Sequence, residues 1–426
     1  MADEHSSAAT LPQAEENRGP PGRILTLDIV RGVAVLGIAA MNVVAFAMPM
    51  EAYLNPLAYG WEDRADGVSW VISFLLFDGK MRGLFSFLFG ASMLLVIERA
   101  EAAGESAARV HFARMAWLLL FGLAHYFFIW NGDILSLYAP VGMIAWFFRE
   151  RSTIELTVAG IIAIVAQLLL FGAMAHQVNE AATAATAPGA GAAAIETWRL
   201  FVDDLTIPTA EELERTLAVY RGSFLEIAAH QFRHELQGPF TSFLVFGPET
   251  LGYMLLGMAT LRCGFLTGAW SDRSYSRIAI GSLALALPAY ALLARALVRA
   301  GFDPVSVYAL SLTATTAVRP LMVLGYAALI ILLTRRGGAL TQRLAAAGRA
   351  AFTNYLGTSI LMTALFYGWG LGLYGHLGRA ELWLAVLPAW ALMLLWSKPW
   401  LQRFRYGPFE WLWRTLARGQ LQPMRR

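Results

Sequence analysis

The sequence is poor in cysteine, in lysine and in charge. Cys263 is the single cysteine among 426 residues, and Lys80 and Lys398 are the only lysines. One cysteine excludes an internal disulfide and any cysteine-based metal or cluster site. Basic residues do not gather with interleaved aromatic residues, as they do on nucleic-acid-binding surfaces. We therefore expect no bound metal and no nucleic-acid partner.

Charged residues make up 15% of the chain and hydrophobic residues 57%. A soluble domain carries about a quarter charged residues. The missing charge is missing in blocks, which is typical of segments that cross a lipid bilayer. The composition predicts a polytopic integral membrane protein, and its expected partner is the lipid bilayer that surrounds it.

The apolar runs predict an all-α fold, a membrane helix bundle of about ten transmembrane helices. The predicted spans are 31–50, 68–97, 115–130, 134–148, 155–175, 242–262, 278–297, 305–334, 351–372 and 382–397. The runs 68–97 and 305–334 are long, and the second is expected to break at Arg319-Pro320, since proline removes a backbone donor. Each is expected to make one net crossing with a broken or re-entrant portion.

Lysine and arginine fall mainly in the segments that are cytoplasmic if the N-terminus is inside. This bias predicts that both termini are cytoplasmic. The expected divisions are a disordered cytoplasmic tail (1–22), five spans (23–175), an extracytoplasmic amphipathic helical segment (176–237), five spans (238–397) and a basic aromatic cytoplasmic tail (398–426). Residues 181–194 are expected to be loosely structured, and an interfacial helix is expected around 408–418.

Asp28 and Arg31 stand at the start of the first span. Their i,i+3 spacing places both on one face of a helix, where they can pair. A charge within a span costs roughly 2.5–3.5 kcal/mol on insertion scales, so such residues usually pair or line a cavity. The pair is predicted either to bind substrate at the cytoplasmic mouth or to anchor the helix at the interface.

Asp78, Lys80 and Arg82 interrupt the second span. Asp78 and Arg82 share a helix face, whereas Lys80 points elsewhere. A break at Gly79 or Gly83 would let all three face one aqueous pocket, because non-helical backbone is tolerated where it lines a cavity. We predict that these residues bind substrate.

His125 lies near the end of the third span, and Asp133 begins the fourth after an Asn131-Gly132 turn. A histidine oriented by a carboxylate is the usual arrangement of a general base. These two residues are the predicted catalytic pair. The alternative is a structural hydrogen bond that closes a tight helical hairpin.

Later spans add Arg319, Asn354 and Tyr355 as candidate substrate-binding residues, together with an intramembrane Glu249. Asn354 alternatively forms a hydrogen bond between helices. His230 and His234 have the spacing of a metal-binding pair but lack a third ligand at recognisable spacing, so they predict no metal site.

Several stretches together resemble the YeiB family of bacterial inner-membrane proteins, whose members carry a domain of unknown function at the C-terminal end. The matching stretches are residues 27–32, 52–59, 80–91, 130–135, 348–349, 353–356, 365–367 and 404–414, with His125 and Tyr138. The resemblance covers nearly the whole chain and implies a multi-pass protein of the bacterial inner membrane.

The family is remotely similar to transmembrane acyltransferases such as heparan-α-glucosaminide N-acetyltransferase. That resemblance implies a ten-helix core, a cytoplasmic acyl-CoA donor and an acceptor across the membrane, and it carries over onto Arg31-Gly32. Those enzymes place their histidine nearer the first two spans, whereas this chain has none there.

The leading hypothesis is an acyl- or acetyltransferase. In this hypothesis Arg31, Lys80 and Arg82 bind an acyl-CoA-like donor, and His125 deprotonates a lipid or glycan acceptor. No cofactor is firmly implied, since acyl-CoA would be a substrate. The alternatives are a transporter or flippase of an anionic or lipidic solute and a non-catalytic membrane scaffold.

Overall fold

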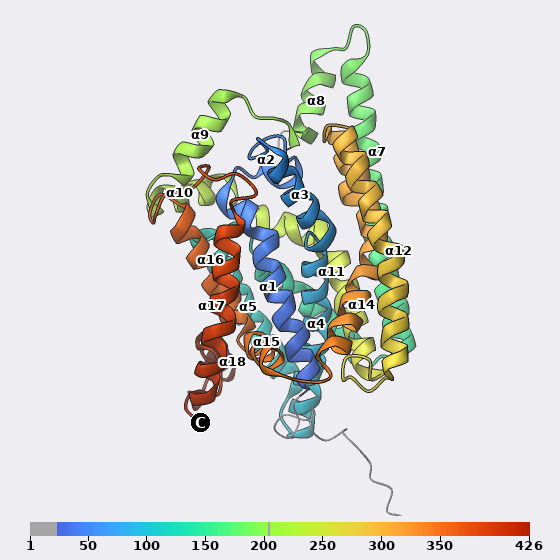
Figure 1. Cartoon of the computed structure of the whole chain (residues 1–426), viewed down its shortest axis with the longest axis vertical. Coiled ribbons are helices and arrows are strands. Elements are labelled where there is room, and N and C mark those ends of the chain that lie inside the picture. Colours follow the sequence, from blue (N-terminus) through green and yellow to red (C-terminus); the bar gives the residue numbers. More distant parts are fainter. Residues whose placement is uncertain (1–23, 203–204) are drawn as a thin grey trace, which may run out of the picture.

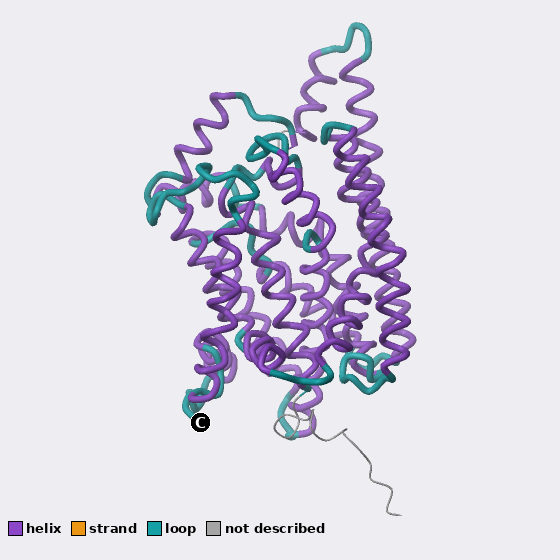
Figure 2. The backbone as a smooth tube through the Cα atoms, in the orientation of Figure 1, coloured by secondary structure: helices purple, strands orange, loops and turns teal. Residues whose placement is uncertain are grey.

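A computed structural model describes residues 24–202 and 205–426. The tail predicted over 1–22 lies outside these residues. The described chain is all-α, with no strand and one isolated bridge between Phe404 and Arg425. Figures 1 and 2 show an upright bundle of long helices with shorter helices and loops at both ends. This helical architecture suits lipid, because each helix satisfies its backbone polar groups internally.

Eight candidate spans in the described part of the chain are long and apolar enough to cross a membrane. They are α1 (Leu25–Ala47), α3 with α4 (Arg64–Leu76, Lys80–Ala102), α5 (Ala107–Phe128), α7 (Thr153–Thr186), α11 (Gly238–Arg262), α12 (Asp272–Arg299), α13 with η3 and α14 (Pro304–Ser306, Val307–Ala314, Thr315–Thr334) and α17 (Trp383–Arg403). The predicted spans 134–148 and 351–372 correspond to shorter helices. These are α6 (Leu135–Ala145) with η1 (Trp146–Phe148), and α16 (Ala351–Phe366).

Each of the two long runs, 68–97 and 305–334, forms one candidate span that contains an interruption. α3 and α4 meet at Gly79, whose φ of 67° is the left-handed conformation that glycine adopts at little cost. The interruption in the other run differs from the prediction. Pro320 lies inside α14, and the irregular part is the π-helix η3, upstream of it.

The remaining helices lie at the two ends of the bundle (Figure 1). One end carries α2 (Glu51–Leu54), α8 (Ala192–Val202), α9 (Ala210–Tyr220) and α10 (Phe224–His234). The other carries α15 (Ala339–Arg349), α18 (Pro408–Arg418) and the C-terminus, and we call it the C-terminal face. The expectation of loose structure over 181–194 was wrong at both edges, because α7 continues to Thr186 and α8 begins at Ala192.

Helix α1 is the centre of the bundle. Nearly all of its residues from Leu27 to Ala47 are buried, whereas only a minority of the residues of α7 and α12 are. α1 packs closely on α15, because Gly32 and Gly348 lack side chains where the two backbones meet: a Cβ on Gly32 would lie 2.0 Å from the Leu344 carbonyl oxygen. This contact brings the start of α1, with Asp28 and Arg31, against the end of α15.

Candidate functional site

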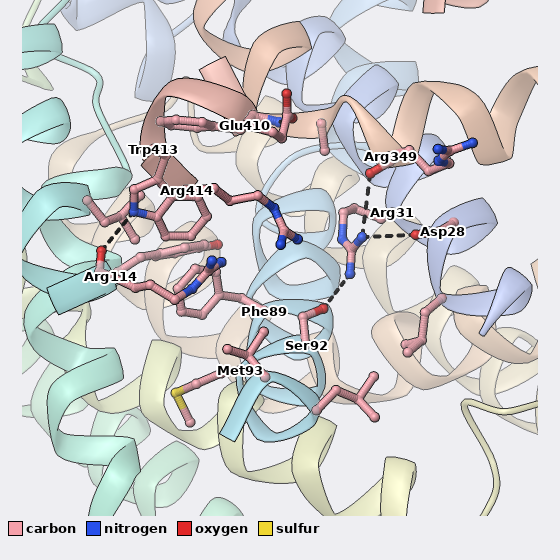
Figure 3. A pocket seen from close by; sticks show the side chains of 18 of the residues that line it. Asp28, Arg31, Phe89, Ser92, Met93, Arg114, Arg349, Glu410, Trp413 and Arg414 are labelled. Carbon is pink, nitrogen blue, oxygen red and sulfur yellow. Dashed lines mark hydrogen bonds and ion pairs between the residues drawn. The ribbon is translucent and has the colours of Figure 1, made fainter. Parts of the chain in front are cut away.

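A cavity of about 630 Å³ opens at the C-terminal face, between α1, α4, α5, α15, α16 and α18. Six arginines and two carboxylates line it, so the lining has a clear positive excess. The arginines are Arg31, Arg99, Arg114, Arg349, Arg405 and Arg414, and the carboxylates are Asp28 and Glu410. Figure 3 shows the guanidinium groups of Arg31, Arg114 and Arg414 gathered around one space.

Neighbouring groups hold these arginines in place. The predicted pair forms: Arg31 Nη1 donates to Asp28 Oδ1 at 3.2 Å, and Arg31 Nη2 donates to Ser92. Arg114 lies 4.0 Å from the centroid of the Trp413 ring, and Trp413 Nε1 donates to the Arg114 carbonyl at 2.9 Å. Fixed cations of this kind suit a phosphate-bearing ligand, because the guanidinium fork matches phosphate oxygens.

The tail that contributes Arg405 and Arg414 folds back on itself beside the cavity. Arg405 N donates to the Met424 carbonyl at 2.9 Å, and Arg414 lies 4.7 Å from the centroid of the Tyr406 ring. Burial lowers the pKa of the Arg414 guanidinium, while Tyr406 acts in the opposite direction. The helix predicted around 408–418 is α18, and it forms a wall of this cavity.

Other walls of the cavity are apolar. They are formed by Phe85, Phe89, Met93, Met115, Leu118 and Phe352. The lining therefore combines a cationic part with an apolar part, and its volume lies within the range of roughly 300–1,000 Å³ that is common for small-molecule sites. Such a site suits a ligand with an anionic head and an apolar chain.

Two tyrosines that line the cavity, Tyr138 and Tyr355, also contact polar groups inside the bundle. Tyr138 Oη lies 2.7 Å from Ser86 Oγ and donates to the Arg82 carbonyl at 3.2 Å. Tyr355 Oη accepts from Ile134 N at 3.2 Å, and its ring centroid lies 5.4 Å from that of His125. Tyr355 thus connects the cavity with the predicted catalytic pair.

His125 and Asp133 lie together as the hairpin predicted. His125 Nδ1 is 2.8 Å from Asp133 Oδ2, and Asp133 Oδ1 accepts from Ser136 N at 2.7 Å. His125 is 3% exposed, and its Nε2 is buried with no hydrogen-bond partner among the described residues. A histidine that donates from Nδ1 to a carboxylate keeps the lone pair on Nε2, as a general base requires. His125 itself does not line the cavity.

Asp78, Lys80 and Arg82 do not meet at the arginine-lined cavity, since none of the three lines it with Arg31. Lys80 is 0% exposed; its ammonium donates to the carbonyls of Phe74 and Asp78 and lies 3.5 Å from the Tyr290 ring centroid. Lys80 therefore binds the Phe74 carbonyl in the last turn of α3, where a helix end leaves carbonyls without partners, and adds a bond to the Asp78 carbonyl, which also accepts from Lys80 N at 2.7 Å.

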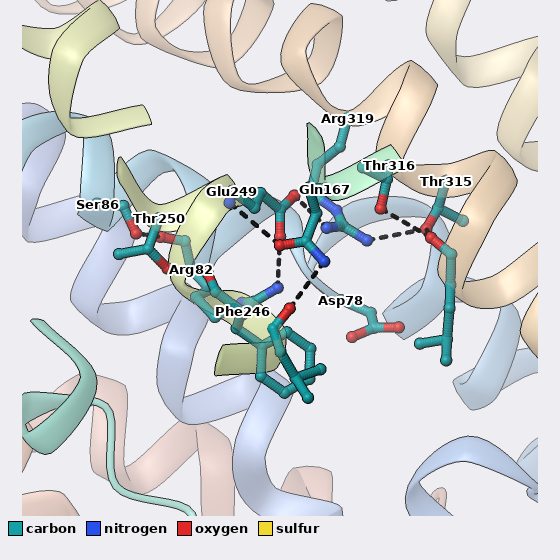
Figure 4. A network of polar contacts seen from close by, with 12 residues as sticks. Asp78, Arg82, Ser86, Gln167, Phe246, Glu249, Thr250, Thr315, Thr316 and Arg319 are labelled. Carbon is teal, nitrogen blue, oxygen red and sulfur yellow. Dashed lines mark hydrogen bonds and ion pairs between the residues drawn. The ribbon is translucent and has the colours of Figure 1, made fainter. Parts of the chain in front are cut away.

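Arg82 instead joins Arg319 through Glu249. Glu249 Oε2 accepts from Arg82 Nη2 at 2.7 Å, and Glu249 Oε1 accepts from Arg319 Nη1 (Figure 4). Arg319 Nη2 also donates to Thr315 Oγ1 at 2.8 Å. Asp78 lies beside this network and accepts from Tyr53 Oη at 3.4 Å. The network is a buried link between α4, α11 and α14 in which two arginines share one carboxylate.

Asn354 is placed as its alternative interpretation expected. Its Nδ2 donates to the Ala347 carbonyl at 2.9 Å and to Ser397 Oγ at 3.2 Å, and its Oδ1 accepts from Trp396 Nε1 at 2.9 Å. These bonds join α15, α16 and α17, and Asn354 is not a lining residue of the cavity.

The rings of His230 and His234 lie with centroids 4.6 Å apart and their planes tilted by 35°. Within the ranges 24–202 and 205–426, no group of three metal-ligating side chains is brought together.

Sequence reasoning missed five of the six cavity arginines: Arg99, Arg114, Arg349, Arg405 and Arg414. They lie in segments assigned to the cytoplasm, where an excess of arginine is already explained by membrane orientation. Their convergence comes from helices far apart in the chain, and no local spacing indicates it.

The fold and the cavity define a class: a multi-pass, all-α membrane protein with an arginine-lined cavity at one face. The chain belongs to the YeiB family. It is 34% identical over 413 residues to "Uncharacterized protein YeiB" of Escherichia coli (strain K12), which covers 93% of this chain and 96% of that protein. It is 29% identical over 423 residues to "Uncharacterized protein YxaH" of Bacillus subtilis (strain 168), covering 94% and 96%.

Residues 260–420 match the family model described as "Protein of unknown function (DUF418)". A third relative, "Uncharacterized 39.9 kDa protein in amylase 3'region" of Bacillus acidopullulyticus, is 23% identical over 406 residues, covering 94% of this chain and 96% of that protein. No solved structure matches the chain.

Proposed function

We propose that this protein is an acyltransferase of the bacterial inner membrane that uses a cytoplasmic acyl-CoA-like donor and transfers the acyl group to a lipid or glycan acceptor. One observation carries the proposal. The arginine-lined cavity reaches Tyr355, whose ring contacts His125, and His125 is bound to Asp133 with its Nε2 left unpartnered.

The donor site follows from the charge and shape of the cavity. The arginines would neutralise the phosphates of the donor, and the apolar walls would hold its thioester arm and acyl group. In this proposal the C-terminal face is cytoplasmic, in keeping with the distribution of arginine. The acceptor would reach His125 from the opposite direction, since His125 lies in the last turn of α5, away from the C-terminal face.

The chemistry assigned to His125 is general-base catalysis. His125 Nε2 takes the proton of the acceptor hydroxyl as its oxygen attacks the thioester carbonyl carbon. The carbon–oxygen bond forms, the carbon–sulfur bond breaks, and the departing thiolate takes from the His125 imidazolium the proton that the acceptor gave up. Asp133 holds the imidazole in the tautomer that this step needs. Because Tyr355 lines the cavity beside His125, its placement would set how the thioester approaches Nε2.

The test is acyl turnover by the purified full-length protein in lipid nanodiscs, measured as release of free thiol from acetyl-CoA and longer acyl-CoAs, beside calorimetric binding of CoA. His125→Gln, which retains a hydrogen bond to Asp133, is expected to lower turnover by about 10²–10⁴-fold while CoA binding is kept. Arg414→Ala is expected to weaken CoA binding.

The exposed His176 offers the matched control, and His176→Ala should leave both quantities unchanged. Uptake of an anionic solute into liposomes without acyl turnover would refute the proposal in favour of a transporter. Absence of turnover, uptake and CoA binding would favour the scaffold.

A further inference from the structure

Glu410 is a carboxylate in a cavity that is otherwise suited to anions. It belongs to α18 and lines the cavity, yet its oxygens bind the first turn of α16. Glu410 Oε1 accepts from Phe352 N at 2.7 Å and from Thr353 N at 3.1 Å, and Oε2 accepts from Thr353 Oγ1 at 2.5 Å. Thr353 Oγ1 in turn accepts from Phe409 N at 3.0 Å. The contact is therefore a reciprocal clamp between the starts of two helices.

Helix α16 depends on this clamp because it has no cap of its own. Its N-cap residue is Ala350, which offers no side-chain acceptor to the unpaired amides of the first turn. A carboxylate at a helix N-terminus is favourable both as an acceptor and through the helix dipole. Burial raises the pKa of Glu410, and the hydrogen bonds from Thr353 oppose that shift. Glu410 supplies from α18 the cap that α16 lacks.

Trp413 donates to α5, and Arg418 lies 3.8 Å from Glu105 in a half-exposed ion pair. The rings of Phe409 and Trp413 also pack on Phe352 of α16, with centroids 6.2 and 5.5 Å from it. Among the polar contacts of α18 in the described part of the chain, the Glu410 clamp is the one that joins α18 to α16. It therefore offers a direct polar route by which a movement of α18 reaches α16.

The clamped turn carries Tyr355, two residues beyond Thr353. Tyr355 accepts from Ile134 N, next to Asp133, and its ring contacts His125. Asn354 holds the same turn to Ala347 and Ser397, so loss of the clamp loosens the turn without releasing the helix. The start of α16 therefore determines how Tyr355 lies against the histidine.

We propose that Glu410 is a positioning residue: through Thr353 it sets the placement of Tyr355 at His125, and so links the C-terminal wall of the cavity to the histidine site. Arg405 and Arg414 belong to the same wall as Glu410. An anion that binds these two arginines therefore also restrains the clamp between Glu410 and α16. The effect on catalysis rests on the proposed function, whereas the mechanical link between α18 and Tyr355 does not.

The link is tested by hydrogen–deuterium exchange of the full-length protein in nanodiscs, with and without CoA. Glu410→Gln keeps the size of the side chain and removes its charge, and Thr353→Val removes the hydroxyl partner. Both are expected to speed exchange over residues 352–356 by about tenfold, the effect of losing one charge-assisted cap. Glu105→Gln, which removes the ion pair between Glu105 and Arg418 of α18, should leave exchange over 352–356 unchanged.

CoA is expected to slow exchange in α18 and in 352–356 of the unmodified protein, but only in α18 of the Glu410→Gln variant. For turnover, Glu410→Gln should lower kcat by about tenfold while CoA affinity stays within twofold, because the cavity arginines remain. Unchanged exchange over 352–356 in both variants would overturn the proposal. Exchange that is accelerated equally throughout α18 and α16, together with loss of CoA binding, would also overturn it. That result would mean that Glu410 only holds the cavity wall together and does not position Tyr355.

If the unmodified protein turns over no acyl-CoA, the proposed function fails. The comparison of exchange over residues 352–356 between the variants without CoA still tests whether Glu410 positions the start of α16.

Discussion

Charged residues buried in this bundle are satisfied in two different ways. Glu249 takes up two arginines at once, with Arg82 on one oxygen and Arg319 on the other. Lys80 forms no ion pair of this kind among the described residues and instead binds the carbonyls of Phe74 and Asp78 and the face of Tyr290. A buried charge without a partner lowers the stability of the fold. Removing one member of such a network therefore leaves the remaining charges buried and uncompensated.

The change Glu249→Gln tests this at the level of one residue. It leaves two buried arginines facing a neutral amide, and it is expected to cost about 3–5 kcal/mol of stability. The measurement is thermal unfolding in detergent. Glu211→Gln is the control, since Glu211 pairs with Arg215 at 3.6 Å on the exposed surface of α9. That surface pair should contribute nothing measurable. Equal midpoints for the two variants would show that the network does not hold α4, α11 and α14 together.

At the scale of elements, close approach of helix backbones organises the bundle. Gly348 faces the Asp28 carbonyl oxygen, which would lie 1.8 Å from an added Cβ, and Gly32 faces Leu344 in the same way. The pair Gly90 and Gly257 does this between α4 and α11. Small residues at such crossings are the usual basis of helix packing in membranes. The glycine after Arg31 therefore serves packing, which places Arg31 within 3.5 Å of the Gly348 carbonyl oxygen.

Replacing Gly32 by alanine is expected to push α1 away from α15 and cost about 1–3 kcal/mol, as overpacking does. It should also weaken CoA binding, because Arg31 moves with α1. Gly357→Ala is the matched control, since Gly357 lies within helix α16 and no heavy atom lies within 4 Å of an added Cβ. That control should be neutral or stabilising, because alanine favours helix. A Gly32→Ala variant as stable as the Gly357→Ala variant would contradict the close crossing.

At the scale of the whole molecule, the two ends of the bundle differ in chemistry. The C-terminal face carries the arginine-lined cavity, α15 and α18, while α8, α9 and α10 cover the opposite end (Figure 1). The three helices α8, α9 and α10 lie in the chain between the long helices α7 and α11, in the segment whose amphipathic pattern predicted helices. The proposed orientation places the C-terminal face in the cytoplasm, where acyl-CoA would be available.

Cysteine labelling measures this orientation. Cys263 is exposed in the loop after α11, and Gly191 is an exposed position between α7 and α8. A membrane-impermeant maleimide should label Cys263 only in permeabilised cells. In a Cys263→Ser background, Gly191→Cys should be labelled in intact cells. The reversed pattern would place the cavity outside and remove acyl-CoA as its donor.

Local pattern accounts for much of the candidate site. The i,i+3 spacing of Asp28 and Arg31 predicted their pairing, and the Asn131-Gly132 turn predicted the approach of Asp133 to His125. In both cases the partners lie within one helix or one hairpin, where the geometry follows from residue spacing alone. The partner of Arg82, Glu249, lies on a distant helix, which no local spacing indicates. Lys80 binds the nearby carbonyls of Phe74 and Asp78, and its contact with Tyr290 is the distant one.

The sequence by itself determined the membrane class, the helical spans and the two short-range charge pairs, because hydrophobic length and residue spacing are local properties. Only the tertiary structure decided that arginines from α1, α4, α5, α15 and the C-terminal tail meet in one cavity. It alone placed Glu410 at the start of α16 and Tyr355 against His125. These contacts depend on how closely helices cross, and that distance is set by small residues whose partners lie hundreds of positions away.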